Sequence, residues 1–120
     1  MSKFVIRKVS SGVKFDLRSP NGQTIATSEV YESMAYCRKG IDAVRKNAPV
    51  AKFEDQMEAS APLCNPKFEL YRDKQGFYRF RLKARNGKII AISEAYAAKS
   101  ACEAGIEAVR RWAPTAETEA

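Results

Sequence analysis

Apolar and polar residues alternate along short segments that occur in both halves of the chain. Phe15 and Leu17 are separated by one polar residue, and Phe80 and Leu82 repeat that spacing. A period of two residues is typical of a strand with one buried face. Extended to its neighbours, the pattern predicts strands over residues 4–8, 13–18 and 23–29, and again over 68–72, 78–83 and 88–94.

The period then changes to that of a helix. Apolar residues in the first half are spaced three, four and three apart at Met34, Cys37, Ile41 and Val44, with Gly40 on the same side. This spacing predicts an amphipathic helix that packs closely on the sheet through its glycine.

The helix boundaries differ between the halves at the start and agree at the end. Ser33 is predicted to cap the first helix, whereas its counterpart Ala98 lacks a capping oxygen. Pro49 and Pro114 are expected to stop both helices. A last strand is predicted over 51–56, and a more polar one over 115–118.

These patterns recur because the chain contains an internal duplication. With a shift of 65, residues 13–49 align with 78–114, and 17 of the 37 pairs are identical. The sequence therefore predicts a first β-β-β-α-β unit over 1–55, a linker over 56–66 and a second unit over 67–120. Because about 50 residues form a small core, both units together are expected to make one compact folding unit, a monomer.

An Asn-Gly pair marks the turn after the second strand of each unit. A three-residue loop pairs Leu17 with Ile25 and Phe15 with Thr27, whereas a two-residue loop pairs Leu17 with Ala26. We expect the three-residue loop, because it keeps the apolar side chains on one face. Its glycine then takes the left-handed conformation.

Several short motifs occur in the same order in both units. In the second unit they are 68–74 (FELYRDK), 78–90 (YRFRLKARNGKII), 93–96 (SEAY) and 102–109 (CEAGIEAV). In these motifs the chain resembles the YegP-like family of small bacterial proteins of unknown function, in its tandem-repeat form. The resemblance implies an α+β fold with a pseudo-twofold antiparallel sheet, two helices on one face and exchanged last strands. It implies no activity, substrate or catalytic residue.

The composition limits the kinds of catalytic and metal-binding site that the protein can form. The 120 residues carry a net charge of +7, 45% are hydrophobic, and there is no histidine, so the commonest general base and metal ligand are missing. Cys37 and Cys102 lie on the apolar helix stripe, and Cys64 lies in the linker, without metal-site spacing. We expect no metal, no cofactor and no membrane segment, and a cytoplasmic protein.

Basic residues concentrate on one strand and its hairpin. Segment 78–88 contains five cations and no acidic residue, and three of the cations alternate with apolar residues. A basic sheet face can neutralise nucleic-acid phosphates, or it can simply solvate an open sheet. The candidates for nucleic-acid contact are Lys14, Arg18, Arg79, Arg81, Lys83, Arg85 and Lys88.

The motif Ser-Glu-x-Tyr follows the third strand in both units. Glu29, Tyr31, Glu94 and Tyr96 could line a pocket near the axis between the units, which would suit an enzyme. Alternatively, each glutamate complements a helix N-terminus and each tyrosine packs on the helix. The sequence favours a non-enzymatic protein that binds an unidentified macromolecule, with a nucleic-acid-associated protein and an enzyme as the alternatives.

Overall fold

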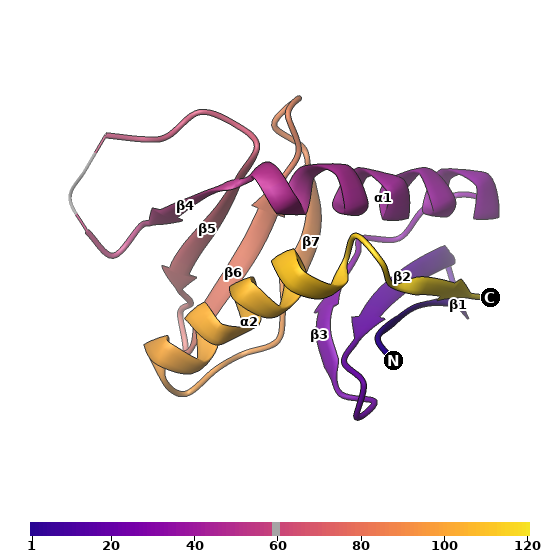
Figure 1. The fold of residues 1–120 in the computed structure, drawn as a ribbon, viewed down its shortest axis with the longest axis horizontal. Helices are drawn as coiled ribbons and strands as arrows, with labels where there is room; N and C mark the ends of the chain where they lie inside the picture. The colour runs from indigo at the N-terminus through magenta and orange to yellow at the C-terminus, as the bar shows by residue number, and fades with distance from the viewer. Residues whose placement is uncertain (59–60) are drawn as a thin grey trace.

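The computed structural model describes residues 1–58 and 61–120, and each unit contains the expected elements in the expected order (Figure 1). The first unit comprises β1 (Lys3–Val9), β2 (Gly12–Arg18), β3 (Thr24–Thr27), α1 (Met34–Asn47), a short 3-10 helix (Ala48–Val50) and β4 (Lys52–Asp55). The second comprises β5 (Lys67–Arg72), β6 (Tyr78–Lys83), β7 (Ile89–Ser93), α2 (Lys99–Trp112) and β8 (Glu117–Glu119). None of the helices described here is long and apolar enough to span a bilayer.

The strands of both units form a single sheet in the order β4-β5-β6-β7-β3-β2-β1-β8. β3 pairs with β7 at the centre, and each final strand lies at the outer edge of the other unit: β4 beside β5, and β8 beside β1. The α+β fold and the exchange of the last strands are therefore confirmed. The two outer pairs are parallel, whereas the other pairs of neighbouring strands are antiparallel.

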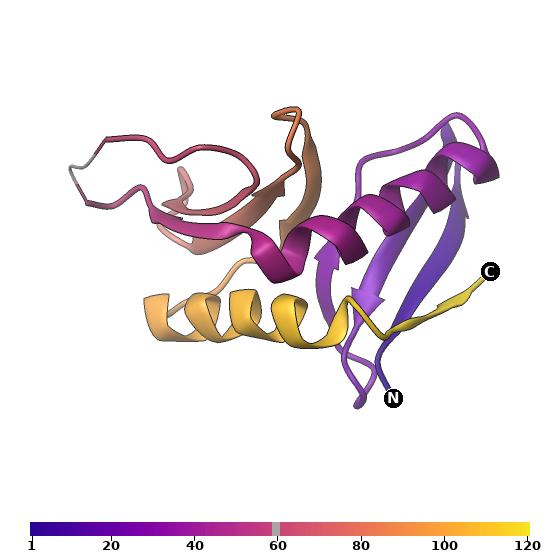
Figure 2. The same ribbon diagram turned by 45° about the horizontal axis from the view of Figure 1, so that its top comes forward.

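Both helices cover the same face of the sheet, and each leads into the half of the sheet built by the other unit (Figure 2). Four phenylalanines, Phe4, Phe15, Phe68 and Phe80, are almost completely buried beneath the helices. The predicted helix stripes are buried at Cys37, Gly40, Ile41 and Val44 and at their counterparts in α2, whereas Met34 is 36% exposed. Ser33 caps α1 by accepting a hydrogen bond from Tyr36 N at 3.2 Å, and Ala98 makes no such bond.

A duplicated arginine holds each exchanged strand in place. Arg45 in α1 donates to Ala116 O at 2.7 Å and to Thr118 Oγ1 at 2.9 Å, both in the C-terminal segment of the second unit. Its counterpart Arg110 in α2 donates to Ala51 O, immediately before β4 of the first unit. Each helix therefore binds the final strand of the other unit by charge-assisted hydrogen bonds.

The hairpin loops have the expected length, but the predicted register is wrong. Gly22 and Gly87 have φ angles of +87° and +85°, and Ser19 N bonds to Gln23 O at 2.8 Å across a three-residue loop. Leu17 nevertheless pairs with Ala26 instead of Ile25, and Thr27 pairs with Asp16 instead of Phe15, because β3 contains a bulge. A bulge adds one residue to a strand, and here it allows Ile25 and Ala26, neighbours in sequence, both to be buried.

Close packing between α2 and the sheet depends on Gly105. A Cβ atom at this position would lie 2.6 Å from Tyr96 Oη and 3.0 Å from Phe80 Cε2. We expect Gly105→Ala to destabilise the protein by about 1–2 kcal/mol, because overpacking outweighs the gain of about 1 kcal/mol in helix propensity. Urea unfolding measures the change.

The matched test removes the obstructing hydroxyl. Tyr96→Phe alone should be nearly neutral, and Gly105→Ala should cost less stability in that background than in the wild type. An equal cost in both backgrounds would show that contact with Tyr96 Oη is not the cause.

Candidate functional site

The basic strand β6 lies beside buried carboxylates. On the sheet face away from the helices, Lys67, Arg81 and Lys83 surround Glu54 and Glu69, five residues that we call the charge cluster. Arg81 Nε lies 2.6 Å from Glu69 Oε1, and Lys67 Nζ lies 2.9 Å from Glu54 Oε1. With three cations and two anions, the charge cluster has a net charge of only +1.

Both carboxylates of the charge cluster are held in their ionised form. The backbone N–H of Leu63, 2.6 Å from Glu54 Oε1, and the Lys67 ammonium lower the pKa of Glu54 to about 2, against the effect of burial. Burial raises the pKa of Glu69, but hydrogen bonds from Arg81 and Lys67 outweigh it and bring the pKa below its ordinary value. The charge cluster is therefore a stable ion-pair network at neutral pH.

In the first unit, the equivalent position on the open sheet face carries a carboxylate instead of a cation, and arginines neutralise it. Asp16 takes the strand position that Arg81 has in the second unit. Asp16 is 3% exposed, and its carboxylate accepts hydrogen bonds from Arg7 Nε at 2.9 Å and Thr27 Oγ1 at 2.7 Å. Burial raises the pKa of Asp16, but the bonds from Arg7, Thr27 and Arg18 bring it below its ordinary value.

Most of the predicted nucleic-acid contacts thus have a carboxylate partner. Arg18 pairs with Asp16, Arg79 pairs with Asp73 at 2.9 Å, and Arg81 and Lys83 share Glu69. Among the residues that the structure describes, the predicted contacts without an ion pair are Lys14, Arg85 and Lys88.

The Ser-Glu-x-Tyr motifs lie apart. Antiparallel pairing of β3 with β7 sends the chain after each strand in opposite directions, so Glu29 and Tyr31 are not brought together with Glu94 and Tyr96. The Tyr31 ring stacks on Phe15 with 6.3 Å between the ring centroids. Burial raises the pKa of both tyrosines, and both glutamates are exposed.

The motif serines, for which no role was predicted, have a structural one. Ser28 Oγ accepts from Phe15 N at 2.9 Å and donates to Glu29 O at 2.7 Å. Ser93 makes the same two bonds in the second unit. Each serine thus joins the end of a third strand to the strand beside it.

Cys37 and Cys102 are buried, and Cys64 is exposed. Burial raises the pKa of the Cys37 thiol and raises that of Cys102 to about 12. Neither buried thiol is activated as a nucleophile.

Each helix forms a groove with the hairpin of the other unit. The first, which we call the basic groove, lies between α1 and the turn after β6 and has a volume of about 430 Å³. Its charged lining consists of Lys39, Asp42, Lys46 and Arg85, and Asp42 pairs with Arg45 at 3.2 Å. The three cations have no ion-pair partner within 1–58 and 61–120.

The equivalent groove of the second helix, the apolar groove, lies between α2 and the turn after β2 and has a volume of about 440 Å³. The shift of 65 relates the residues of the two grooves. Lys39 corresponds to Ala104, and Asn47 corresponds to Trp112. One pseudo-symmetric position has thus become basic and the other apolar.

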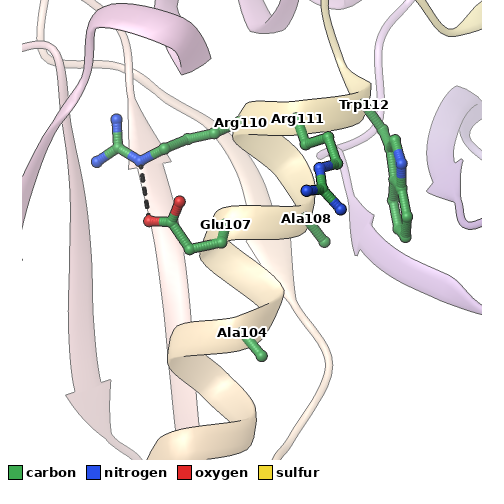
Figure 3. A pocket seen from close by; sticks show the side chains of 6 residues that line it. All are labelled: Ala104, Glu107, Ala108, Arg110, Arg111 and Trp112. Atoms are coloured by element: carbon green, nitrogen blue, oxygen red, sulfur yellow. Dashed lines mark ion pairs between the residues drawn. The ribbon is translucent and has the colours of Figure 1, made fainter.

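Trp112 also borders a second hollow of about 480 Å³ on the outer side of α2 (Figure 3). The figure shows the Arg111 side chain beside the Trp112 indole, whereas Arg110 and Glu107 point to the other side of the helix and pair with each other. The indole therefore borders two concave surfaces, and an arginine lies beside it.

Sequence reasoning missed the grooves and the charge cluster. Glu69 could have been found, because alternation along β5 places it on the same face as the basic residues of the neighbouring strand β6. Glu54 could not, since the exchanged strand β4 brings it from the other unit. The grooves could have been found from the alignment of the two units. Outside the buried stripes, the two helices carry different residues at equivalent positions.

Comparisons with known proteins agree with the fold. The chain is 34% identical over 116 residues to a UPF0339 protein of Pseudomonas aeruginosa, covering 96% of this chain and 93% of that one. It is 58% identical over 50 residues to a UPF0339 protein of Treponema denticola, covering 42% of this chain and 86% of the relative. The solution NMR structure of yegP from E. coli, a protein of unknown function, superposes with a TM-score of 0.79 at 33% identity, covering 98% of this chain and 90% of that one.

A family model described as "Domain of unknown function (DUF1508)" matches residues 10–55 and again residues 73–119. The two matches fall in the two units of the duplication. The expected resemblance to YegP-like proteins is thereby confirmed, and the chain belongs to the DUF1508 family, in the form that contains two repeats.

Proposed function

We propose that the protein is non-enzymatic and acts by binding a nucleic acid in the basic groove. The observation that carries this proposal is the convergence of Lys39 and Lys46 from one unit with Arg85 from the other in one concave surface. None of the three has an ion-pair partner in the described part of the chain. Cations that remain unpaired are those that bind phosphates and release counterions.

The basic groove suits this role better than the open sheet face. Arg81 is engaged twice, by the Glu69 carboxylate and by the Tyr71 ring, whose centroid lies 4.5 Å from the guanidinium carbon. A phosphate would have to displace a buried carboxylate to reach this guanidinium. Among the described residues that line the basic groove, the only carboxylate is that of Asp42, which is already paired with Arg45.

The side chains considered for catalysis support a binding role. The raised pKa values of Cys102 and of the motif tyrosines keep these groups protonated at neutral pH. The motif glutamates lie on the surface at opposite ends of the β3–β7 pair. An enzyme would need such groups gathered in one site.

Salt-dependent binding tests the proposal. We expect micromolar binding of a labelled oligonucleotide at about 50 mM salt, weakening linearly with the logarithm of salt concentration. The triple variant Lys39→Glu, Lys46→Glu, Arg85→Glu should bind at least about tenfold more weakly and lose about 2–3 units of salt slope. Fluorescence anisotropy measures both quantities.

A charge-matched variant provides the control. Lys8, Lys52 and Lys74 are exposed and lie outside both grooves, and changing all three to Glu alters the net charge by the same amount. Equal losses in both triple variants would contradict a localised site. Wild-type protein that fails to bind at about 50 mM salt would exclude nucleic acid as the partner.

A further inference from the structure

On the helix side, the apolar groove is lined by residues whose counterparts do not line the basic groove. Its lining includes Gly105 of α2 and the side chain of Tyr96, whereas the equivalent Gly40 and Tyr31 do not line the basic groove. Two substitutions account for the difference: Ala101 and Ala104 stand where the first unit has Tyr36 and Lys39. In the first unit these two long side chains contact each other, with Lys39 Nζ 5.6 Å from the centroid of the Tyr36 ring.

The apolar groove combines aromatic surfaces with uncharged polar groups. The Trp112 indole and the Tyr96 ring lie on the α2 side, and Ile25 lies among the hairpin residues. The polar members of the lining are Ser19, Asn21, Gln23 and Thr24. None of the described residues that line the groove is charged at neutral pH, so the groove suits an uncharged ring with hydrogen-bonding atoms at its edge.

A cation lies just outside the apolar groove. Arg111 is exposed, lies beside the Trp112 indole in Figure 3 and has no ion-pair partner in the described residues. A ligand with a neutral heteroaromatic ring and a nearby phosphate would fit this surface, because the ring would enter the groove and the phosphate would pair with Arg111. This is the chemistry of one nucleotide unit.

We propose that the apolar groove binds an unpaired nucleobase, stacked against Trp112, with Arg111 on the adjacent phosphate. The inference rests on the proposed function, since it makes the nucleic acid single-stranded at this point. A base inside a duplex is already stacked and paired, so it cannot enter the groove without being extruded. Single strands expose their bases and bind on aromatic side chains without sequence preference.

Trp112 is the only tryptophan in the sequence, so tryptophan fluorescence reports on the apolar groove and on the hollow that borders the same indole. We expect an oligothymidylate of about 12 nucleotides to quench the emission, and a duplex of the same length to quench it far less. An abasic strand of equal length and charge should leave the emission unchanged. These titrations use the full chain.

The blocking variant is Ala104→Lys, which restores the first-unit residue at an exposed position. Added positive charge by itself strengthens binding to a polyanion, so weaker binding must come from occlusion of the groove. We expect about tenfold weaker binding of the single strand, which is about the loss of one stacked base. Ala97→Lys, with the same charge at an exposed position outside the groove, should retain full affinity and quenching.

The outcomes separate this inference from the proposed function. Salt-dependent binding of single strand and duplex alike, without quenching, overturns the inference and leaves the basic groove intact as a site. Quenching with unchanged affinity in the triple basic-groove variant supports the inference and excludes the basic groove as the proposed site. Quenching by N-acetyl-tyrosinamide but not by the oligonucleotide overturns the inference, because the groove then accepts a protein side chain.

Discussion

A fragment that contains only residues 67–120 is expected to fold as a dimer and not as a monomer. In the full chain, β7 pairs with β3, and β5 pairs with β4 of the other unit. The isolated fragment keeps neither partner and leaves both edges of a three-stranded sheet open. About 50 residues also bury too little apolar surface for comfortable stability.

A second copy of the same fragment can supply what is missing. The two β7 strands would pair across a true twofold axis, and each β8 would lie beside the partner's β5, as β4 does in the full chain. The relative from Treponema denticola is about as long as one unit, since a match of 50 residues covers 86% of its length. Sedimentation equilibrium should give twice the fragment mass.

Unfolding should then depend on concentration. For the fragment, each tenfold dilution should lower the urea midpoint, because dissociation accompanies unfolding. The midpoint of the full chain should not change on dilution, since its partner unit is covalently attached. A fragment that unfolds cooperatively as a monomer would contradict the mutual dependence of the units.

The second large effect is expected from Lys67→Met in the charge cluster. The Lys67 side chain is 8% exposed and contacts both Glu54 and Glu69, at 2.9 and 3.2 Å. Removing it leaves two buried carboxylates short of a cation, and breaking such a buried pair costs about 3 kcal/mol. Urea unfolding at pH 7 measures the loss, and Lys14→Met, a cation on the same face without an ion pair in the described residues, should cost far less.

The loss of stability caused by Lys67→Met should become smaller at acidic pH. Because the Leu63 N–H and the Lys67 ammonium lower the folded-state pKa of Glu54 from 4.5 to about 2, these interactions contribute full stability above about pH 4.5, and that contribution disappears as the pH falls towards 2. The variant keeps the Leu63 hydrogen bond and lacks only the part that Lys67 contributes, so the difference in stability between the two proteins should shrink between these pH values. A difference in stability that stays constant down to pH 2 would show that packing, not charge, is responsible.

Local pattern and duplication were enough to predict the fold. Alternation around Phe15 and Phe80 identified the central strands, and the helical spacing of Cys37, Ile41 and Val44 identified the helix, because each element buries one face. The predicted register was wrong at Ile25 because it rests on strict alternation, whereas a bulge interrupts the period of two there and allows the adjacent Ile25 and Ala26 both to be buried. Both residues are buried only when the helices cover the sheet.

The candidate site was harder to predict because its chemistry depends on contacts between units. The sequence of β6 alone gives Arg81 no anionic partner, but Glu69 lies directly across from it on the neighbouring strand. The side chains of the basic groove come from α1 and from the turn after β6, which are about 40 residues apart in the chain. Strand exchange brings such segments together, and the local spacing of residues in the sequence does not predict this contact.

Because the two units are joined in one chain, their sequences can differ, which is impossible in a symmetric dimer of identical chains. In a dimer of identical chains every substitution occurs twice, so a lysine that suits one groove is also imposed on the other. Here Lys39 and Ala104 occupy equivalent positions and differ. A single tandem chain can therefore specialise each half of one sheet separately, at the cost of encoding the same core twice.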